Sequence, residues 1–402
     1  MNVDRPFQEA KLIAVGDIFL GGDLYYQGLD CEILSSRLQE LFESVGVRIA
    51  NLESPLIPLS KIDSRYSPMP DKLLHAAPEQ MIQYLKKLHI DVVTLANNHI
   101  FDYGEEGLRE TLRVLTENGI QYCGAGFNLK EARKPVLVDI GSVSFSLHSY
   151  TAYNMSYLRM IVPASEDSYG VAPLKLSYVE QDLDHSDADI KIVYLHWGRE
   201  HILYPNPRDK VDLGKRIVDL GADVILGSHA HVIQRVDSHE GKPVFYSLGN
   251  FLFPNFCYQN PAQIVYPGRS ELKDFRRNRT EDLPKAKVCI YKTWREINRI
   301  SLVAHIRFCE DDITFEETYC IQDANEPRID ILDGESSNHI RDEVYRAVNY
   351  HIRLKKWEIT TFIKAIRYLY YSYGFLGMVR TIFSRMLLAI FTFFNRAKKS
   401  AS

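Results

Sequence analysis

The stretch that decides the fold is Asp223-Val224-Ile225-Leu226-Gly227-Ser228-His229-Ala230-His231. A short apolar run leads into a glycine and then into two histidines that are separated by one residue. Glycine permits a close backbone approach at this point, and in an extended chain both imidazoles would point to one face. The stretch therefore predicts a buried strand that carries two metal-ligating side chains at its carboxyl end.

Other apolar runs upstream end in polar side chains in the same way. Residues 11–16 lead to Asp17, 47–50 to Asn51-Leu52-Glu53, 91–95 to Asn97-Asn98-His99, and 190–195 to His196-Trp197-Gly198. Taken singly, an Asp after a strand is often a cap, and a lone His there is more often a hydrogen-bonded core residue. Open α/β sheets, however, keep their sites at the carboxyl ends of strands. The recurrence of these endings therefore favours one shared site.

Strands alternate with predicted helices, which indicates an α/β fold with helices covering the sheets. Helices are expected from Pro78 onward and over 104–118 and 209–220, and further strands over 135–147, 243–248 and 299–321. Residues 254–298 look like an insertion that contains more Lys and Arg than acids. Two interpretations of it stay open, a solvated loop and a basic flap over an anionic substrate.

The bulk composition excludes several classes of protein. With 46% hydrophobic and 25% charged residues among 402, the chain is neither disordered nor short of core material. None of the six cysteines belongs to a Cys-x-x-Cys pair, so the sequence contains neither a zinc knuckle nor a redox motif of that type. The net charge of −4 does not suggest a nucleic-acid partner. The N-terminus lacks the apolar region of a secretory signal, so we expect a cytoplasmic protein with free thiols.

The side chains at the strand ends indicate which cofactors to expect. Carboxylate and imidazole ligands suit Mn, Fe or Zn. Hydrolases that use two such ions hold them about 3.5–4 Å apart around the reacting group. We therefore expect one or two divalent metal ions.

The linked motifs resemble those of the CapA/PgsA-type capsule synthesis family, which is tied to poly-gamma-glutamate biosynthesis in bacteria. The motifs that carry the resemblance are Asn51-Leu52-Glu53, Asn97-Asn98-His99, His196-Trp197-Gly198, Gly227-x-His229-x-His231 and Tyr246-Ser247-Leu248-Gly249-Asn250-Phe251. The resemblance spans about residues 10–322. It implies a calcineurin-like metallophosphoesterase-type β-sandwich flanked by helices, in a CapA-type domain over residues 1–330.

The resemblance also implies the ligands of both ions. The first ion would be bound by Asp17 and His231, and Glu53 would bridge the two ions. The expected ligands of the second ion are Asn98, His196 and His229.

A catalytic role falls to His99, which would protonate the leaving group or steady the transition state. The expected supporting residues around the ligands are Asp102, Glu200 and Asn250. Phosphoesterases commonly carry a His two places after the first Asp, where this chain has Phe19. That departure would leave the first ion with only Asp17, Glu53 and His231 as protein ligands.

The expected reaction is the attack of a metal-bound hydroxide on a phosphoester or related bond, with an anionic polymer or a phosphoester as substrate. One alternative is hydrolysis or transfer of a gamma-glutamyl amide by the same site. A second alternative is not an enzyme but a membrane-docked scaffold for the synthesis or export of an anionic polymer.

Residues 331–402 are expected to form a basic, apolar helical tail. Its part 351–402 contains ten Lys and Arg against the single acid Glu358. The longest run without charge, 368–379, is shorter than the ~20 residues of a spanning helix. We therefore expect an interfacial helix on anionic lipid, peripheral on the inner face of the membrane. The alternatives are packing on the body or an oligomer contact.

Overall fold

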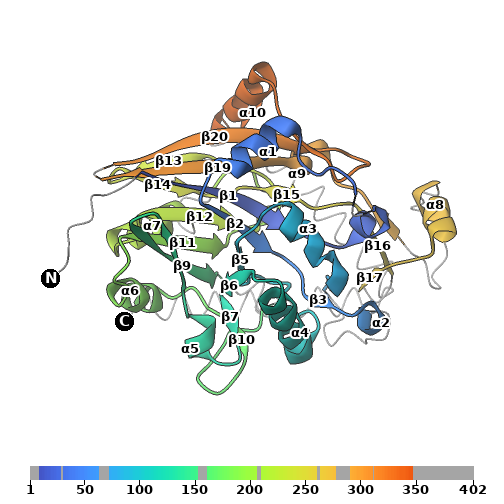
Figure 1. Ribbon diagram of the computed structural model, residues 1–402, viewed down its shortest axis with the longest axis horizontal. Helices are drawn as coiled ribbons and strands as arrows, with labels where there is room; N and C mark the ends of the chain where they lie inside the picture. Colours follow the sequence, from blue (N-terminus) through green and yellow to red (C-terminus); the bar gives the residue numbers. More distant parts are fainter. Residues whose placement is uncertain are drawn as a thin grey trace, which may run out of the picture. The chain divides into compact units, whose positions relative to one another are not determined.

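Two β-sheets that enclose a shared apolar layer carry the strands predicted from the sequence (Figure 1). The computed structural model describes residues 9–28, 30–62, 72–152, 161–205, 210–259, 263–277, 290–310 and 312–346. The chain divides into two units, and the second, 281–288 with 348–402, lies outside the described residues. The predicted amphipathic tail over 351–402 therefore also lies outside them.

The first sheet has the strand order β21-β20-β19-β1-β2-β5-β6, and β15 pairs with the end of β1. Neighbours from β1 to β6 run parallel, whereas β19, β20 and β21 add antiparallel strands on the other side of β1. The bounds are β1 Ala10–Ile18, β2 Val47–Leu52, β5 Val92–Thr94, β6 Gln121–Cys123, β15 Asn250–Leu252, β19 Ile300–Cys309, β20 Asp312–Gln322 and β21 Ile329–Ile331.

The second sheet has the order β13-β14-β12-β11-β9-β8, with parallel strands in the middle and an antiparallel strand at each edge. Its bounds are β8 Val136–Ile140, β9 Val143–Thr151, β11 Ile190–His196, β12 Val224–Ser228, β13 Val236–His239 and β14 Lys242–Phe245. The short strand pairs β3 (Leu56–Ile57) with β4 (Ala77–Pro78), and β7 (Ala125–Gly126) with β10 (Gly170–Val171), lie outside both sheets.

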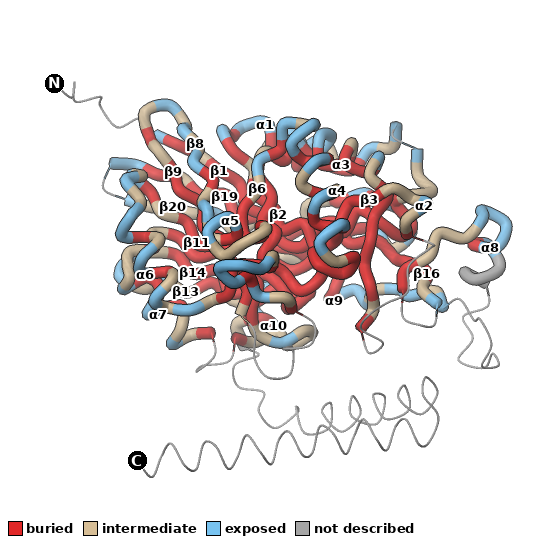
Figure 2. Tube along the Cα trace, turned by 90° about the horizontal axis from the view of Figure 1, so that it is seen from below, coloured by how far each residue is buried: buried red, intermediate tan, exposed pale blue. Residues whose placement is uncertain are grey.

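The alternation of side chains along β1 explains the layered packing. Leu12 and Ala14 join the apolar cluster between the sheets, whereas Ile13 and Val15 join the cluster on the outer face. Tyr194 of the second sheet donates a hydrogen bond from Oη to the carbonyl of Val15, at 2.9 Å, across the layer between the sheets. Figure 2 shows that the central strands are buried along most of their length, while helices at the periphery expose one side.

Helices complete the two outer layers. The outer face of the first sheet packs against α1 (Ser36–Glu43), α3 (Ile82–Lys87) and α4 (Gly104–Glu117), and that of the second against α6 (Leu176–Asp184) and α7 (Asp212–Asp219). The remaining helices are η1 Gly22–Tyr26, α2 Leu59–Ile62, η2 Glu79–Met81, α5 Leu129–Ala132, α8 Arg269–Arg277, α9 Glu296–Arg299 and α10 Gly334–Arg346. The expected α/β sandwich flanked by helices is thus confirmed. Among the described residues, none of the helices has the length and apolar character needed to cross a membrane.

Three local expectations need correction. Pro78 closes β4 rather than opening the helix, which begins as the 3-10 turn Glu79–Met81. The strand expected over 243–248 stops at Phe245, because the chain turns at Gly249 (φ +74) to enter β15. Residues 254–298 are not only a loop, since β16 (Phe256–Gln259) pairs with β17 (Gln263–Val265) and β18 (Ile290–Lys292).

Candidate metal centre

Five strands from both sheets place the predicted ligands at one end of the sandwich. Asp17 lies near the end of β1, and Glu53 directly follows β2. In the second sheet His196 is the last residue of β11. The other residues follow β5 and β12: Asn98, His99, His229 and His231. All of these side chains are buried.

A close backbone approach sets the position of Asp17. Its amide donates a 2.9 Å hydrogen bond to the carbonyl of Gly249, at the entrance to β15. A Cβ at the preceding residue, Gly16, would stand 1.9 Å from that same carbonyl oxygen. Only glycine at position 16 therefore lets β1 and β15 come close enough to seat Asp17.

Two groups of ligand atoms share Glu53. In one group, ligand atoms of Asp17, Glu53 and His231 lie within 4.8 Å of one another, and in the other, those of Glu53, His196 and His229 do so. Glu53 Oε1 lies 3.6 Å from His196 Nε2 and 3.7 Å from His231 Nε2. Glu53 thus stands between the two groups, the position expected of a bridging carboxylate.

Asn98 adds an amide oxygen to the second group. Its Oδ1 lies 2.7 Å from His196 Nε2. The other ring nitrogen of His196, Nδ1, lies 2.9 Å from the hydroxyl of Ser228. A proton on Nδ1 that is shared with Ser228 would leave Nε2 free to bind a metal ion.

The buried carboxylates of Glu53 and Asp17 have the properties of cation ligands. Both oxygens of Glu53 are buried and accept no hydrogen bond from the described residues. Burial, followed by the charges of Asp17 and Glu200, raises the pKa of Glu53 well above its usual range. Burial also raises the pKa of Asp17, against the charge of His231 and a hydrogen bond from Asn51. A divalent cation would offset the cost of burying these negative charges.

The imidazoles are suited to the same ion. Burial, followed by the charges of neighbouring histidines, lowers the pKa of both His196 and His229 well below the usual range. Both rings are therefore neutral at physiological pH, and a neutral imidazole is the form that binds metal. The donor set of carboxylate, imidazole and amide thus matches the expected cofactor class.

The two histidines after β12 do not adopt the extended conformation expected from the sequence. His229 has φ +82 and His231 has φ +53, so both lie in the left-handed region. Because a residue with a side chain rarely occupies that region, each adds about 1–3 kcal/mol of local strain. The bend sends His229 to one ligand group and His231 to the other, which an extended strand presenting both on one face would not do.

A layer of amides that the sequence did not assign holds the ligands in place. Asn51 Nδ2 donates to Asp17 Oδ1 at 2.8 Å, and Asn97 Nδ2 donates to Asn51 Oδ1 at 3.1 Å. Asn97 Oδ1 in turn accepts the backbone amide of His99 at 3.0 Å. Both asparagines stand in the quoted motifs, but their types alone do not distinguish a turn residue from a ligand support.

Two of the three expected supporting residues contact histidines of the site. Asp102 Oδ2 is 2.7 Å from His99 Nδ1, and Asn250 Oδ1 is 2.8 Å from His231 Nδ1. Glu200 is half-buried, and its charge contributes to the raised pKa of Glu53.

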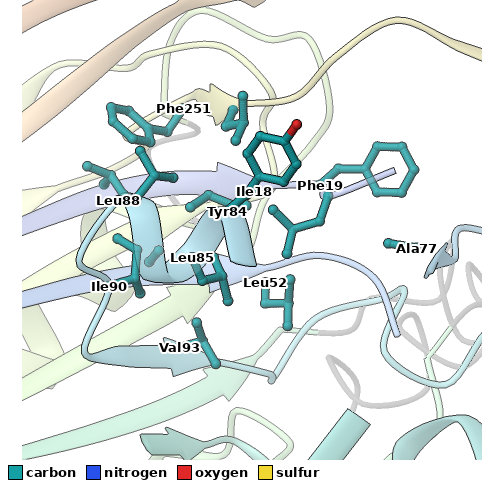
Figure 3. Close-up of a cluster of buried hydrophobic side chains, with 14 of the residues drawn as sticks. Ile18, Phe19, Leu52, Ala77, Tyr84, Leu85, Leu88, Ile90, Val93 and Phe251 are labelled. Atoms are coloured by element: carbon teal, nitrogen blue, oxygen red, sulfur yellow. The ribbon is translucent and has the colours of Figure 1, made fainter. Parts of the chain in front are cut away.

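Phe19 belongs to the apolar cluster on the outer side of the first sheet (Figure 3). Its ring packs 5.1 Å from the ring of His75 and 5.3 Å from that of Phe253. The position where phosphoesterases commonly have a histidine therefore supplies packing, and the group of Asp17 and His231 gains no ligand from it.

The segment after β18, which belongs to the predicted insertion, forms one wall of the site through residues that were not predicted as site residues. The Trp294 ring lies 5.8 Å from the His231 ring and 6.2 Å from the His201 ring. Asn298 Nδ2 donates to the carbonyl of His231 at 2.9 Å and lies 3.1 Å from His201 Nδ1. These contacts tie residues far along the chain to the bend that holds His231.

Comparisons with known proteins agree with the motifs. Residues 11–255 match the family model of the bacterial capsule synthesis protein PGA_cap. The capsule biosynthesis protein CapA of Bacillus anthracis is 33% identical over 257 residues, which is 62% of this chain and 61% of that protein. The PGA biosynthesis protein CapA of Bacillus subtilis (strain 168) is 28% identical over 247 residues, 60% of this chain and 62% of the relative. The match thus spans about three fifths of each relative.

Among solved structures, the calcineurin-like phosphoesterase YfkN from Bacillus subtilis is similar at a TM-score of 0.42 and 14% identity, covering 85% of this chain and 98% of that one. Likeness at this level leaves the reaction open. The family model, in contrast, matches more than half of the sequence. The chain therefore belongs to the bacterial capsule synthesis protein family PGA_cap.

Proposed function

We propose that this protein is a metal-dependent hydrolase that cleaves a phosphoester bond in the biosynthesis of an anionic capsule polymer. The observation that carries the proposal is Glu53, whose buried carboxylate stands between two ligand groups without a hydrogen bond from the described residues. The names of the two CapA relatives support the pathway, while the chemistry rests on the geometry of the site.

The residues of the site divide the work of hydrolysis. Divalent ions held by the two groups would polarise the scissile group and lower the pKa of water. His99 Nδ1 lies 2.7 Å from Asp102 and donates its proton there, which leaves a lone pair on Nε2. Nε2 would therefore take up the proton that the attacking water releases and then pass it to the leaving oxygen. Burial of His99 keeps bulk water away from this nitrogen.

Positive charge beside the site favours an anionic substrate. The ammonium of Lys292 lies 5.1 Å from the centre of the Trp294 ring, and Trp294 faces His231. Lys292 and Arg295 are both exposed. Burial and then the charge of His231 are the main causes that lower the pKa of the nearby His201 to about 3, and the charges of Lys292 and Arg295 add to them. This basic edge supports the flap interpretation of the insertion over a purely solvated loop.

Elemental analysis of the purified protein tests the metal centre. We expect one to two equivalents of Mn, Fe or Zn in the native protein, and a loss of metal in His229→Ala because one ligand group loses a donor. His239→Ala is the matched control, since His239 pairs with Asp219 at 2.7 Å, away from both ligand groups. Native protein that stays metal-free after dialysis against each of these ions would contradict the proposal.

A side-by-side assay then separates phosphoester from amide chemistry. We expect hydrolysis of a phosphodiester and none of a gamma-glutamyl peptide, with the activity lost in His99→Ala. Hydrolysis of the gamma-glutamyl peptide and not of the phosphodiester would instead support the alternative gamma-glutamyl reaction at the same site.

The scaffold alternative is favoured by one observation, the apolar burial of Phe19 where a further metal ligand is expected. It predicts that His99→Ala leaves the cellular phenotype intact, whereas deletion of 351–402 abolishes it. Location on the inner face of the membrane through that tail is likewise a proposal. Cell fractionation with and without 351–402 tests it, because a tail that binds membrane should move the protein to the membrane fraction.

A further inference from the structure

A second buried cluster surrounds His99. It consists of Lys72, His75 and Asp102, which all lie within the protein interior. Lys72 and His75 stand on the segment between α2 and β4, for which the sequence predicts no element and no site residue. The hydrolytic roles given above make no use of either residue.

Lys72 joins two parts of the site. Its ammonium forms an ion pair with Asp102 Oδ1 and donates a hydrogen bond to the backbone carbonyl of Asn98. The exposed fraction of the Lys72 side chain is 4%, and that of Asp102 is 0%. One cation thus holds both the carboxylate that contacts His99 and the backbone of the adjacent amide ligand.

The other oxygen of Asp102 fixes His99 within the plane of its ring. Asp102 Oδ2 lies 2.7 Å from His99 Nδ1 and accepts the backbone amide of His75 at 2.6 Å. A carboxylate with two hydrogen-bond contacts on one oxygen and an ion pair on the other has little freedom to rotate. The direction in which His99 presents Nε2 is therefore set by the carboxylate and by the cation behind it.

The ring of His75 restrains His99 in the remaining direction. The two imidazoles stack with centroids 3.6 Å apart and planes at 6°. Phe19 and Phe253 pack around His75 at 5.1 and 5.8 Å, so the stacked ring is itself supported by apolar neighbours. A tilt of His99 out of its plane would displace His75 into these aromatic rings.

We propose that Lys72 and His75 are positioning residues that lock His99 in one tautomer and one orientation through Asp102 and the ring stack. The inference rests on the proposed function, because it assumes that His99 serves a leaving group. It goes beyond an ordinary buried ion pair, which would contribute to folding and leave the ring of His99 unaffected.

The test uses four variants of the full chain. Lys72→Met removes the cation, and Lys72→Met/Asp102→Asn removes both charges, so that the double variant leaves no unpaired buried charge if the single one folds poorly. His75→Ala removes the stacked ring, and His75→Phe restores a flat ring at the same place.

The primary readout is the tautomer of His99, observed by long-range proton–nitrogen NMR on protein labelled at its histidines. Native protein should show a single tautomer with the proton on Nδ1, and Lys72→Met should show both. The second readout is the split between kcat and KM on two phosphodiesters, one with an alkyl leaving group and one with p-nitrophenolate, which departs without a proton. We expect Lys72→Met to lose about 100-fold in kcat on the alkyl ester, the scale of a misplaced catalytic group, with KM and metal content unchanged. The loss should be small on the nitrophenyl ester.

The outcomes separate the inference from the proposed function. If native protein hydrolyses neither ester, the proposed function fails, and the NMR signals alone then decide whether Lys72 locks His99. If native protein is active while Lys72→Met, or the double variant where the single one does not fold, keeps one tautomer and native kcat, the inference is overturned. It is likewise overturned if His75→Ala keeps native kcat. Recovery in His75→Phe of most of the activity lost in His75→Ala supports the stack.

Discussion

Replacing Glu53 with Gln should stabilise the metal-free protein and abolish its response to metal. Burial and the charges of Asp17 and Glu200 raise the pKa of Glu53 well above its usual range. An ionised Glu53 is therefore costly in the folded state without a cation. Gln removes the charge at nearly constant volume, so we expect the free energy of unfolding of the metal-free protein to rise by about 1–3 kcal/mol, the usual cost of an unsatisfied buried group. This corresponds to roughly 2 °C in Tm per kcal/mol in a chain of this size.

The stability of the metal-free native protein should depend on pH in a direction that follows from the raised pKa of Glu53. Because the pKa of Glu53 is higher in the folded state, folded protein binds more protons than unfolded protein above the ordinary value of 4.5. The stability of the metal-free protein should fall as pH rises from that value through the folded pKa. Glu53→Gln should reduce this slope without removing it, since the raised pKa of Asp17 acts in the same direction.

Added metal should reverse the order of stability. An ion at a hundred times its Kd stabilises the native protein by about 2.7 kcal/mol, whereas Glu53→Gln should gain almost nothing. Urea unfolding with chelator and with Mn²⁺ measures both effects, and Glu43→Gln, at an exposed position on α1, is the control that should keep the metal response. A metal-free Glu53→Gln protein less stable than the native one would refute the idea of an uncompensated buried carboxylate.

Three further outcomes are expected. Asn250→Ala should weaken one of the two bound ions by about 10–100-fold in calorimetric titration, because Asn250 contacts His231 Nδ1 at 2.8 Å; two unchanged affinities would contradict this support. Phe19→Ala should lower the free energy of unfolding by about 3–5 kcal/mol with unchanged metal content, whereas a loss of metal without a loss of stability would show that the ring serves the site. Lys292→Glu should raise KM for an anionic phosphodiester, and the increase should be larger at low than at high salt. The control is Lys130→Glu, at an exposed position on α5. Equal KM values of the native protein and Lys292→Glu at low salt would show that Lys292 does not contribute to substrate binding.

The parts predictable from the sequence are those that a local pattern encodes. The apolar runs before His196 and Gly227 are short, bounded and continuous, as strands buried on both faces must be, and both form central parallel strands. Since such strands align their carboxyl ends, the polar residues that follow them are expected to meet. The structure brings Asp17 and Glu53 together with His196, His229 and His231, as that reasoning requires.

The parts that could not be predicted depend on contacts between distant segments. Lys72 and His75 follow no periodic pattern, and their partner Asp102 lies about thirty residues further along the chain. Trp294 and Asn298 reach the site from an apparent insertion. The left-handed turn at His231 is a backbone conformation that histidine seldom adopts alone, and the surrounding hydrogen bonds hold it.

The pairing of β1 with β19 shows that the folded domain extends beyond the residues that the family model matches. The family match ends at residue 255, yet Ala10 to Ala14 of β1 pair with Phe308 to Ala304 of β19. In a fragment that ends at residue 255, this part of β1 would be an exposed edge strand. Its backbone N–H and C=O groups would lack hydrogen-bond partners, which promotes aggregation. It would also lose Leu302, Ile306 and Phe308 from the filling between the sheets. Expression of the matched span alone should therefore yield insoluble protein. A truncated form of this chain should keep the residues up to at least 322, where β20 ends.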